Sequence, residues 1–285
     1  MFLFLGYIVI LASSLGTYAV HGNLLALWMP MEYIAIIGLA VGGFVGGNDI
    51  RIVKATLAAI PGALKGSRFT TAFYVDVLAL LYEILAKVRK EGLMSIEGDV
   101  ENPEASPIFG KYPNVVADFH VIEFMTDYLR MMVGGNLNTV EIESLMDVEL
   151  ETHHHEAAAP GTVMNRMADG LPAFGIVVAV MGVVNVMGSV GEPPPVLGKM
   201  IGGALVGTFL GILISYGFVA PLASLLTQKA EEGGTVYKCI KQVLLASMSG
   251  YAPQVAVEFG RKVLDSHARP SFRELEDELK ARRGR

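Results

Sequence analysis

The sequence predicts an all-α integral membrane protein with four transmembrane helices and a helical cytoplasmic domain. The main observation is a pair of long apolar runs, 170–191 and 200–228, that contain no Asp, Glu, His, Lys or Arg. Each run has the roughly 20 residues that a helix needs to cross a bilayer. The second observation is composition, because 52% of the residues are hydrophobic while 18% are charged. That mixture indicates a few membrane spans joined to a substantial water-facing part.

Two further apolar runs near the N-terminus complete the set of predicted spans. The run 1–20 carries no charge before His21, and the run 34–47 is apolar and rich in glycine. The second run reaches span length only when residues 28–33, which include Glu32, are counted with it. The first run could instead be a signal peptide. It lacks a basic start, however, and another apolar run follows almost at once, so a retained helix is favoured.

A proline run separates the third and fourth spans, and the basic residues set the orientation. Glu192-Pro193-Pro194-Pro195 must end a helix, because prolines have no backbone N–H to continue it. The connections 21–31 and 191–199 hold only Lys199, whereas Lys and Arg recur after the second and fourth spans. The positive-inside rule therefore places both termini in the cytoplasm. The predicted organisation is 1–48 for spans one and two, 49–169 for a cytoplasmic loop domain, 170–227 for spans three and four, and 228–285 for a cytoplasmic tail.

The cytoplasmic loop domain is predicted to be helical. Apolar residues recur at helical spacing in 71–91 and again in 114–133. Gly134-Gly135-Asn136 is expected to end the second of these helices. Asn138, with Glu141 three residues later, has the pattern of a capping box that opens another helix.

The tail is also predicted to consist of helices. The helix of the fourth span is expected to continue through about Met248, and residues 250–253 should break it. A second helix should cover roughly Val255 to Leu264. Ser271, with Glu274 three residues later, has the capping-box pattern and should open a charged terminal helix.

Several functional classes are disfavoured by composition and by missing motifs. The single cysteine, Cys239, excludes a disulfide framework and suits a reducing compartment. The net charge of −6 argues against a nucleic-acid partner. The sequence has no phosphate-binding glycine loop followed by Lys and no convincing pairing of a nucleophile with a base. An enzyme is therefore not expected.

The run His153-His154-His155 invites a metal-site interpretation. Adjacent histidines point in different directions on a helix, and no Cys or spaced carboxylate set surrounds them as a zinc site requires. We therefore interpret the run as a solvated linker before Ala157-Ala158-Ala159-Pro160.

Small residues form one face of the predicted fourth span. Gly203, Gly207, Gly211 and Ser215 are each four residues apart. Such spacing lets helix backbones approach closely in lipid. The face could meet another copy or a partner helix, or it could pack within this chain. The pairs Gly42/Gly46 and Gly43/Gly47 give the second span a similar pattern.

Two prolines and one threonine are the polar or irregular features of the last two spans. Pro172 could simply lie in the first turn of a helix, where a missing N–H costs little. The apolar run continues beyond Pro221, so Pro221 should kink the helix or free a carbonyl. Thr208 lies in mid-span, and its hydroxyl could either bond the carbonyl one turn back or line a water-filled ion path.

Charges of opposite sign are separated along residues 87–104. The basic residues come first and the acidic residues follow, and they could form a solvated helix face or steer a complementary partner. The residues are Lys87, Arg89, Lys90, Glu97, Asp99, Glu101 and Glu104.

Four stretches of the chain, in order and spacing, resemble the flagellar motor stator protein family MotA. They are AKVRKEGLMSIEGDVENP at 86–103, LPAFGIVVAVMGV at 171–183, VGTFLGILISYGFVAP at 206–221 and GYAPQVAVEFGRK at 250–262. The similarity extends over nearly the whole chain and is far more specific than a single motif.

The resemblance implies a stator subunit that couples inward ion flow to torque. On the matching positions, it implies that Pro172 and Pro221 couple ion flow to rotation. It also implies that Thr208 faces the ion path, with Ala179 facing it from the third span. The transported ion is expected to be a proton by overall similarity to proton-driven members, with sodium as the alternative. No cofactor is implied.

The resemblance also implies partners and a location. Arg89 and Glu97 match two loop charges that interact with FliG, the rotor's switch-complex protein. The chain is expected to form a homopentamer around a dimer of the single-span protein MotB, in the bacterial inner membrane. MotB would contribute a membrane aspartate, which this chain lacks in its last two spans, and a peptidoglycan-binding domain.

Two other functions remain open from the sequence. An ExbB/TolQ-like energising channel would power outer-membrane processes without rotation, and those relatives have fewer spans. A scaffold that only gathers partners would permit no proton leak when co-expressed with a partner lacking its plug segment.

Overall fold

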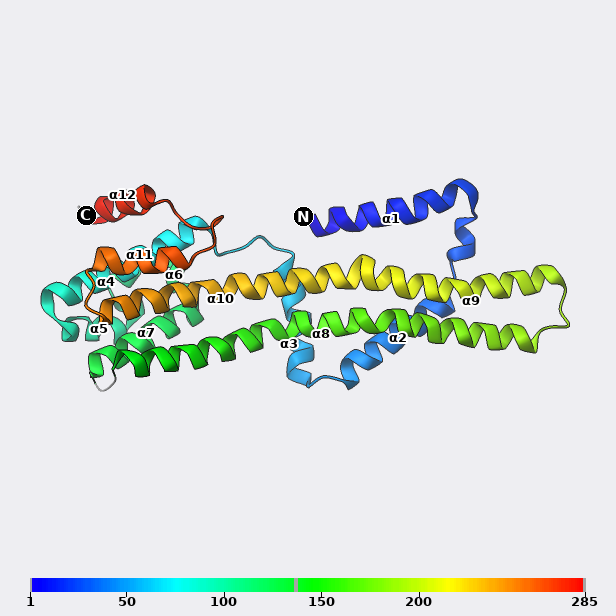
Figure 1. Cartoon of the computed structure of the whole chain (residues 1–285), viewed down its shortest axis with the longest axis horizontal. Helices are drawn as coiled ribbons and strands as arrows, with labels where there is room; N and C mark the ends of the chain where they lie inside the picture. The colour runs from blue at the N-terminus through cyan, green and yellow to red at the C-terminus, as the bar shows by residue number, and fades with distance from the viewer. Residues whose placement is uncertain (1, 136–137, 284–285) are drawn as a thin grey trace. The chain divides into compact units, whose positions relative to one another are not determined.

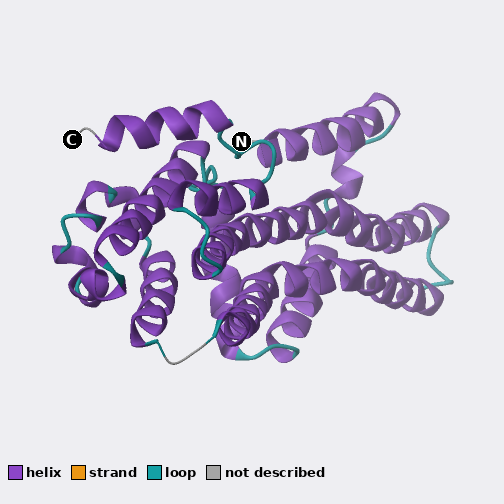
Figure 2. Cartoon of the chain, turned by 60° about the vertical axis from the view of Figure 1, so that its left-hand side comes forward, coloured by secondary structure: helices purple, strands orange, loops and turns teal. Residues whose placement is uncertain are grey.

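The computed structural model describes residues 2–135 and 138–283, and every regular element in that part is a helix (Figure 2). Contacts divide the chain into two units. Unit 1 comprises Met1–Gly66 and Ala158–Lys229, and unit 2 comprises Ser67–Ala157 and Ala230–Arg285. The all-α prediction is confirmed. Four helical stretches within the described residues are long and apolar enough to cross a membrane, namely Phe2–His21, Leu24–Gly46, Thr139–Gly188 and Pro194–Met248.

The first two spans bury little of their surface within the chain. Helix α1, Phe2–His21, has no buried residue, and α2, Pro30–Gly46, buries only Ile36 and Ala40. A helix that is apolar all round and exposed in this way needs lipid or another apolar surface to cover it. A single 3₁₀ turn, Leu24–Leu27, connects the two helices. Pro30 starts α2 at a position where a missing N–H costs little.

The third and fourth spans belong to very long helices (Figure 1). Helix α8 runs from Thr139 to Gly188, and α9 covers Pro194–Ile214. A π-helical segment, Ser215–Val219, follows α9 and leads into α10, Ala220–Met248. As predicted, the proline run separates the two spans, with Pro194 in the first turn of α9.

Two interpretations made from the sequence are wrong, because α8 begins much earlier than the third span. Pro172 lies inside α8 and does not start a helix, and His153–His155 also lie inside α8 and do not form a linker. The helix starts at the predicted capping box. The Asn138 amide donates to Glu141 Oε2 at 2.8 Å, and the Glu141 amide donates to Asn138 Oδ1 at 3.0 Å. Asn136, which was expected to end the preceding helix, lies outside the described residues.

Unit 2 is built around α4, Thr71–Glu91, which has the predicted bounds. The predicted helix 114–133 is interrupted, because a short α6, Pro113–Val116, comes before α7, Phe119–Gly134. Asp118 lies between them in an extended conformation, with φ −94° and ψ 91°. Its carboxylate is buried and pairs with Arg68 Nη2 at 3.0 Å. This buried ion pair therefore lies at the point where the predicted helix is interrupted.

Helix α10 ends at Met248 as predicted, and two more helices complete unit 2. Helix α11 covers Pro253–Val263, and α12 covers Phe272–Arg283. Residues from α4, α7, α10, α11 and α12 form one continuous apolar core. The remaining helices are α3 Ile50–Ala63 in unit 1, and the short elements Leu93–Ile96, α5 Glu97–Glu101, Pro103–Ala105 and Phe109–Lys111 in unit 2.

Candidate functional site

A hydrogen bond between the third and fourth spans occurs where Pro172 interrupts α8. Proline has no N–H, so the carbonyl four residues earlier, that of Ala168, loses its helical partner. The Ser215 hydroxyl donates to this carbonyl at 2.6 Å, and both residues are buried. A hydroxyl of the fourth span therefore satisfies the carbonyl that Pro172 frees in the third. This is why the proline can lie inside a continuous helix.

Ser215 also begins the π-helical segment that precedes the second proline. The Ala220 amide bonds the Ser215 carbonyl five residues back, so the helix is wider here than an α-helix. Pro221 follows and cannot donate to the next carbonyl. The predicted disturbance at Pro221 therefore takes the form of a π-helical segment. Such segments occur often at functional sites.

Helix α1 contacts this same segment through a tyrosine. The Tyr7 hydroxyl donates to the Phe218 carbonyl at 2.8 Å, and the two rings have their centroids 4.9 Å apart. A Cβ atom added at Gly217 would lie 3.1 Å from Ile10 Cγ2. Hydroxyl groups of two residues, Ser215 and Tyr7, thus bond backbone carbonyls around the two prolines.

The small-residue face of the fourth span packs against the third span of the same chain. A Cβ atom added at Gly175 would lie 2.8 Å from the Gly207 carbonyl oxygen and 3.0 Å from Gly211 Cα. A Cβ atom added at Gly211 would lie 2.8 Å from Gly175 Cα. The backbones therefore touch, and Gly207 and Gly211 serve packing within the chain. Gly203 lies instead near Met29 and Glu32.

Thr208 and Ala179 lie beside this close contact. A Cβ atom at Gly207 would be 3.3 Å from the Ala179 nitrogen, so Ala179 faces the residue next to Thr208. Both residues are half-buried within unit 1. In the part of the chain that the structure describes, the Thr208 hydroxyl forms no hydrogen bond, so the expected bond to the carbonyl one turn back is not seen.

Arg89 and Glu97 lie on the surface of unit 2, on either side of the turn that ends α4. Both side chains are exposed. Gly92, with φ +88°, turns the chain between them, and this conformation favours glycine. The Arg89 guanidinium donates to the Gly250 carbonyl at 3.4 Å, and the structure gives no ion pair between Arg89 and Glu97 among its described residues. The two charges remain directed to solvent.

Other charges of the same segment have structural partners. Lys87 Nζ pairs with Asp99 Oδ2 at 2.7 Å, and the Ser106 hydroxyl donates to Asp99 Oδ1 at 2.6 Å. Arg130 holds Glu101, with Nε 2.9 Å from Oε1. The separated charges of residues 87–104 are therefore not one solvated face. Some of them fix the fold, whereas Arg89 and Glu97, together with Lys90 and Glu104, remain exposed.

The histidine run has a structural use within unit 2. The ring of His153 lies on Tyr237, with centroids 4.4 Å apart, while His154 and His155 are exposed. Burial, and next the nearby His120, lower the pKa of His153 below its usual value of 6.5. Across residues 2–135 and 138–283, no three His, Cys, Asp or Glu side chains are grouped so that they could hold a metal ion.

Ser215 and Tyr7 were not identified as site residues from the sequence. Ser215 carries a partial signal, since it continues the four-residue spacing of Gly203, Gly207 and Gly211. That spacing, however, indicates only a small side chain at this position and says nothing about the use of its hydroxyl. Tyr7 gave no signal, because one tyrosine in an apolar span is common at a membrane interface.

Two family models and the sequences of known proteins match this chain. Residues 4–92 match the family model of the motility protein A N-terminal region, and residues 119–238 match that of the MotA/TolQ/ExbB proton channel family. Motility protein A of Escherichia coli (strain K12) is 49% identical over 282 residues, which cover 99% of this chain and 96% of that protein.

Two solved structures have the same fold. The structure of C. jejuni MotAB matches with a TM-score of 0.75 and 20% identity, covering 94% of this chain and 98% of that one. The flagellar MotAB stator complex from Bacillus subtilis matches with a TM-score of 0.70 and 22% identity, covering 90% and 92%. Both are complexes named for MotA together with MotB.

Proposed function

The chain belongs to the motility protein A family, the MotA subunits of the flagellar motor stator, and from this premise we propose that it works with MotB to convert inward ion flow into torque. The observation that carries the proposal is the pair of spans 170–191 and 200–228. Their backbones are in contact at Gly175 and Gly211, and they have no acidic, basic or histidine side chain. Ion carriers generally place an ionisable group inside the membrane, and these two spans have none, so the proposal is that another chain supplies it. Glu32, in the first turn of α2, lies at the end of the second span and near Gly203.

MotB is the proposed source of that group, an aspartate in its single span. The proton, or alternatively sodium, would bind the aspartate beside Thr208 and Ala179. Binding neutralises the carboxylate, which lowers the cost of keeping it in an apolar environment and changes its interaction with the surrounding spans. A homopentamer of this chain would then turn by one step around the MotB dimer. The peptidoglycan-binding domain of MotB would hold the complex in place.

Pro172 and Pro221 are proposed to couple the ion-binding step to movement. Each proline removes one hydrogen bond of its helix, and the Ser215 hydroxyl takes up the carbonyl freed by Pro172. A bond from a side chain is exchanged more easily than a bond of the helical ladder. The two spans can therefore bend here at a lower cost than elsewhere along their length.

Arg89 and Glu97 are proposed to contact FliG on the rotor, each through a group of opposite charge. Their exposure supports this role, since the neighbouring charges Lys87 and Asp99 are paired internally. The chain is proposed to lie in the inner membrane with both termini, and therefore unit 2, in the cytoplasm. The distribution of Lys and Arg supports that orientation.

The ion-conduction proposal is tested by co-expressing the chain with MotB from which the plug segment has been removed. Intracellular acidification is then measured with a pH-sensitive fluorescent protein. We expect a leak with the unplugged MotB, and no leak with this chain alone or with MotB whose membrane aspartate is changed to asparagine. A leak from this chain alone would overturn the proposal. Swimming speed with and without sodium, in the presence of a protonophore, distinguishes the two ions.

Two alternatives are distinguished by the same measurements. An ExbB/TolQ-like channel is disfavoured, because four helical stretches among the described residues can span a membrane and those relatives have fewer. A scaffold without ion conduction would give no leak in the unplugged complex. The rotor contact is tested by swimming of Arg89→Glu and Glu97→Lys variants, singly and together. Normal swimming in all three would exclude the contact.

A further inference from the structure

Two exposed apolar side chains lie between Arg89 and Glu97. Leu93 and Met94 belong to the 3₁₀ turn Leu93–Ile96, and they are 38% and 64% exposed. Exposed apolar side chains that occur singly are normal on a protein surface, but neighbouring ones rimmed by charged residues are typical of a binding site. Methionine is well suited to this use, because its flexible side chain adapts to the shape of a partner.

The turn that carries these residues is fixed by its surroundings. Ile96, two residues after Met94, is fully buried in the core of unit 2. The Ser95 hydroxyl donates to the Gly92 carbonyl at 2.6 Å, and just beyond the turn Asp99 is held by Lys87 at 2.7 Å. Leu93 and Met94 are therefore presented on a firm support, and their exposure is a feature of the fold.

A second exposed apolar group lies on the other side of Arg89. The Arg89 guanidinium bonds the carbonyl of Gly250, the residue before Tyr251. Tyr251 stacks on Phe259 with ring centroids 5.1 Å apart, and the two residues are 48% and 40% exposed. Arg89 therefore has exposed apolar side chains on both sides, Leu93 and Met94 on one and Tyr251 and Phe259 on the other.

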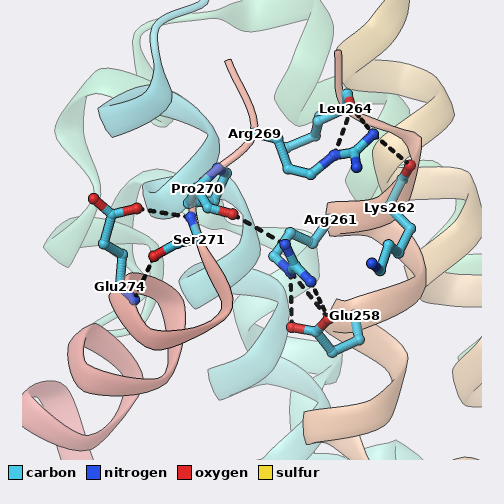
Figure 3. Close-up of polar contacts among 8 residues, drawn as sticks. All are labelled: Glu258, Arg261, Lys262, Leu264, Arg269, Pro270, Ser271 and Glu274. Atoms are coloured by element: carbon cyan, nitrogen blue, oxygen red, sulfur yellow. Dashed lines mark hydrogen bonds and ion pairs between the residues drawn. The ribbon is translucent and has the colours of Figure 1, made fainter. Parts of the chain in front are cut away.

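Helix α11, which carries Phe259, packs closely against α10 through the next residue, Gly260. A Cβ atom added at Gly260 would clash with Val243 Cγ2 and would lie 3.0 Å from the Cys239 carbonyl oxygen, so α11 and α10 are in close contact. Arg261 is buried and bonds both Glu258 and the Pro270 carbonyl (Figure 3). The exposed position of Phe259 is therefore fixed as well.

We propose that Leu93 and Met94 form the apolar centre of the rotor contact, with Arg89 and Glu97 as its charged rim. This inference rests on the proposed function, in which those two charges meet FliG. The partner surface should be an apolar pocket or helix face with an acidic group opposite Arg89 and a basic group opposite Glu97. Charges at a rim set the association rate and the register, while apolar contacts at the centre supply most of the affinity.

The test measures binding of purified FliG to the purified complex of this chain with MotB, by biolayer interferometry. Met94→Ser should weaken binding about tenfold, as expected for a central apolar contact. The loss should be similar at ~0.1 M and ~1 M salt, where the screening length falls from about 10 Å to about 3 Å. Arg89→Glu should weaken binding mainly at low salt. Val148→Ser is the matched control, because Val148 is 63% exposed in the same unit, and it should bind normally.

The results separate failure of this inference from failure of the proposed function. If a charge-reversed FliG restores binding to Arg89→Glu while Met94→Ser binds like the wild type, the rotor contact stands and the apolar centre is overturned. If FliG does not bind the wild-type complex at all, both are overturned.

Crosslinking distinguishes the rotor from a second copy of this chain as the occupant. Cys239 is fully buried, and burial raises the pKa of its thiol to about 12, so Met94→Cys introduces the one reactive thiol. A crosslink from Met94→Cys to a cysteine on FliG supports the proposal. A disulfide between two copies of this chain, with none to FliG, overturns it.

Discussion

The Ser215 hydroxyl and the Ala168 carbonyl are joined by a buried hydrogen bond of 2.6 Å. Ala168 lies four residues before Pro172, so its carbonyl is the one that this proline leaves without a helical donor. Ser215 in turn begins the π-helical segment before Pro221. The irregularities that the two prolines impose on neighbouring helices are therefore connected through one side chain.

Removing the Ser215 hydroxyl should destabilise the complex with MotB. In Ser215→Ala the Ala168 carbonyl becomes buried without a donor, which costs about 0.6–2 kcal/mol within a membrane. Ser215→Thr retains a hydroxyl and should lose less. The measurement is the thermal unfolding midpoint of the purified complex. Ser224→Ala, at an exposed serine of α10, is the control and should unfold like the wild type.

The same substitution should matter much less when Pro172 is absent. In Pro172→Ala the helix regains an N–H that can bond the Ala168 carbonyl, so Ser215→Ala added to it should cost little further. The four midpoints form a double-mutant cycle. Equal losses in both backgrounds would show that Ser215 acts independently of Pro172.

A methyl group at Gly175 should separate the third and fourth spans. The added Cβ would lie 2.8 Å from the Gly207 oxygen, and this atom and the next two nearest, Gly211 Cα and N, all belong to backbone that cannot move aside. Gly175→Ala should cost about 1–3 kcal/mol, as overpacking does. Gly202→Ala serves as control, because beyond its chain neighbours and its own helix backbone no atom of the described residues lies within 4 Å of its added Cβ. Equal unfolding midpoints for the two variants would contradict the close contact.

Unit 2 should lose stability in mild acid because of His153. Its pKa is lowered in the folded chain, chiefly by burial, so below pH 6.5 the unfolded chain binds a proton that the folded chain does not. The contribution of His153 is therefore complete at neutral pH and is lost as the pH falls through 6.5 towards the lowered pKa. His153→Gln should show a smaller fall in unfolding midpoint between neutral and acidic buffer. His155→Gln, at an exposed histidine, should behave as the wild type.

Cys239 should not react with a maleimide reagent while unit 2 is folded. The thiolate is the reactive form, and burial raises the pKa of this thiol to about 12. Mass spectrometry of the native complex should find no adduct, whereas the denatured chain should be labelled fully. Rapid labelling under native conditions would show that α10 opens locally around this residue.

Features with a local physical cause could be predicted from the sequence. The four spans follow from length and hydrophobicity, and the bounds of α4 follow from its apolar period. The capping boxes at Asn138 and Ser271 need only two side chains three residues apart. The Ser271 amide does donate to Glu274 Oε2 at 2.7 Å (Figure 3).

Features that depend on a neighbouring helix could not be predicted. A proline inside a helix is tolerated when another group takes the freed carbonyl, and Ser215 is 47 residues away from Ala168 in the sequence. The stretch 87–104 gives no sign that Lys87 and Asp99 pair internally while Arg89 and Glu97 remain exposed. Asp118 likewise interrupts a strong helical pattern, and its carboxylate pairs with Arg68, a residue far away in the sequence.

The two groups that form the contact at Pro172, the Ser215 hydroxyl and the Ala168 carbonyl, lie in the same chain, as do Gly175 and Gly211. This has a genetic consequence for an assembly of several copies. A wild-type copy cannot repair the contact in a variant neighbour, so the defects of Ser215→Ala and Gly175→Ala stay with the chain that carries them. In a cell that expresses both alleles, the impairment should increase with the share of variant chains. Two such variants, one at each position, should not complement each other.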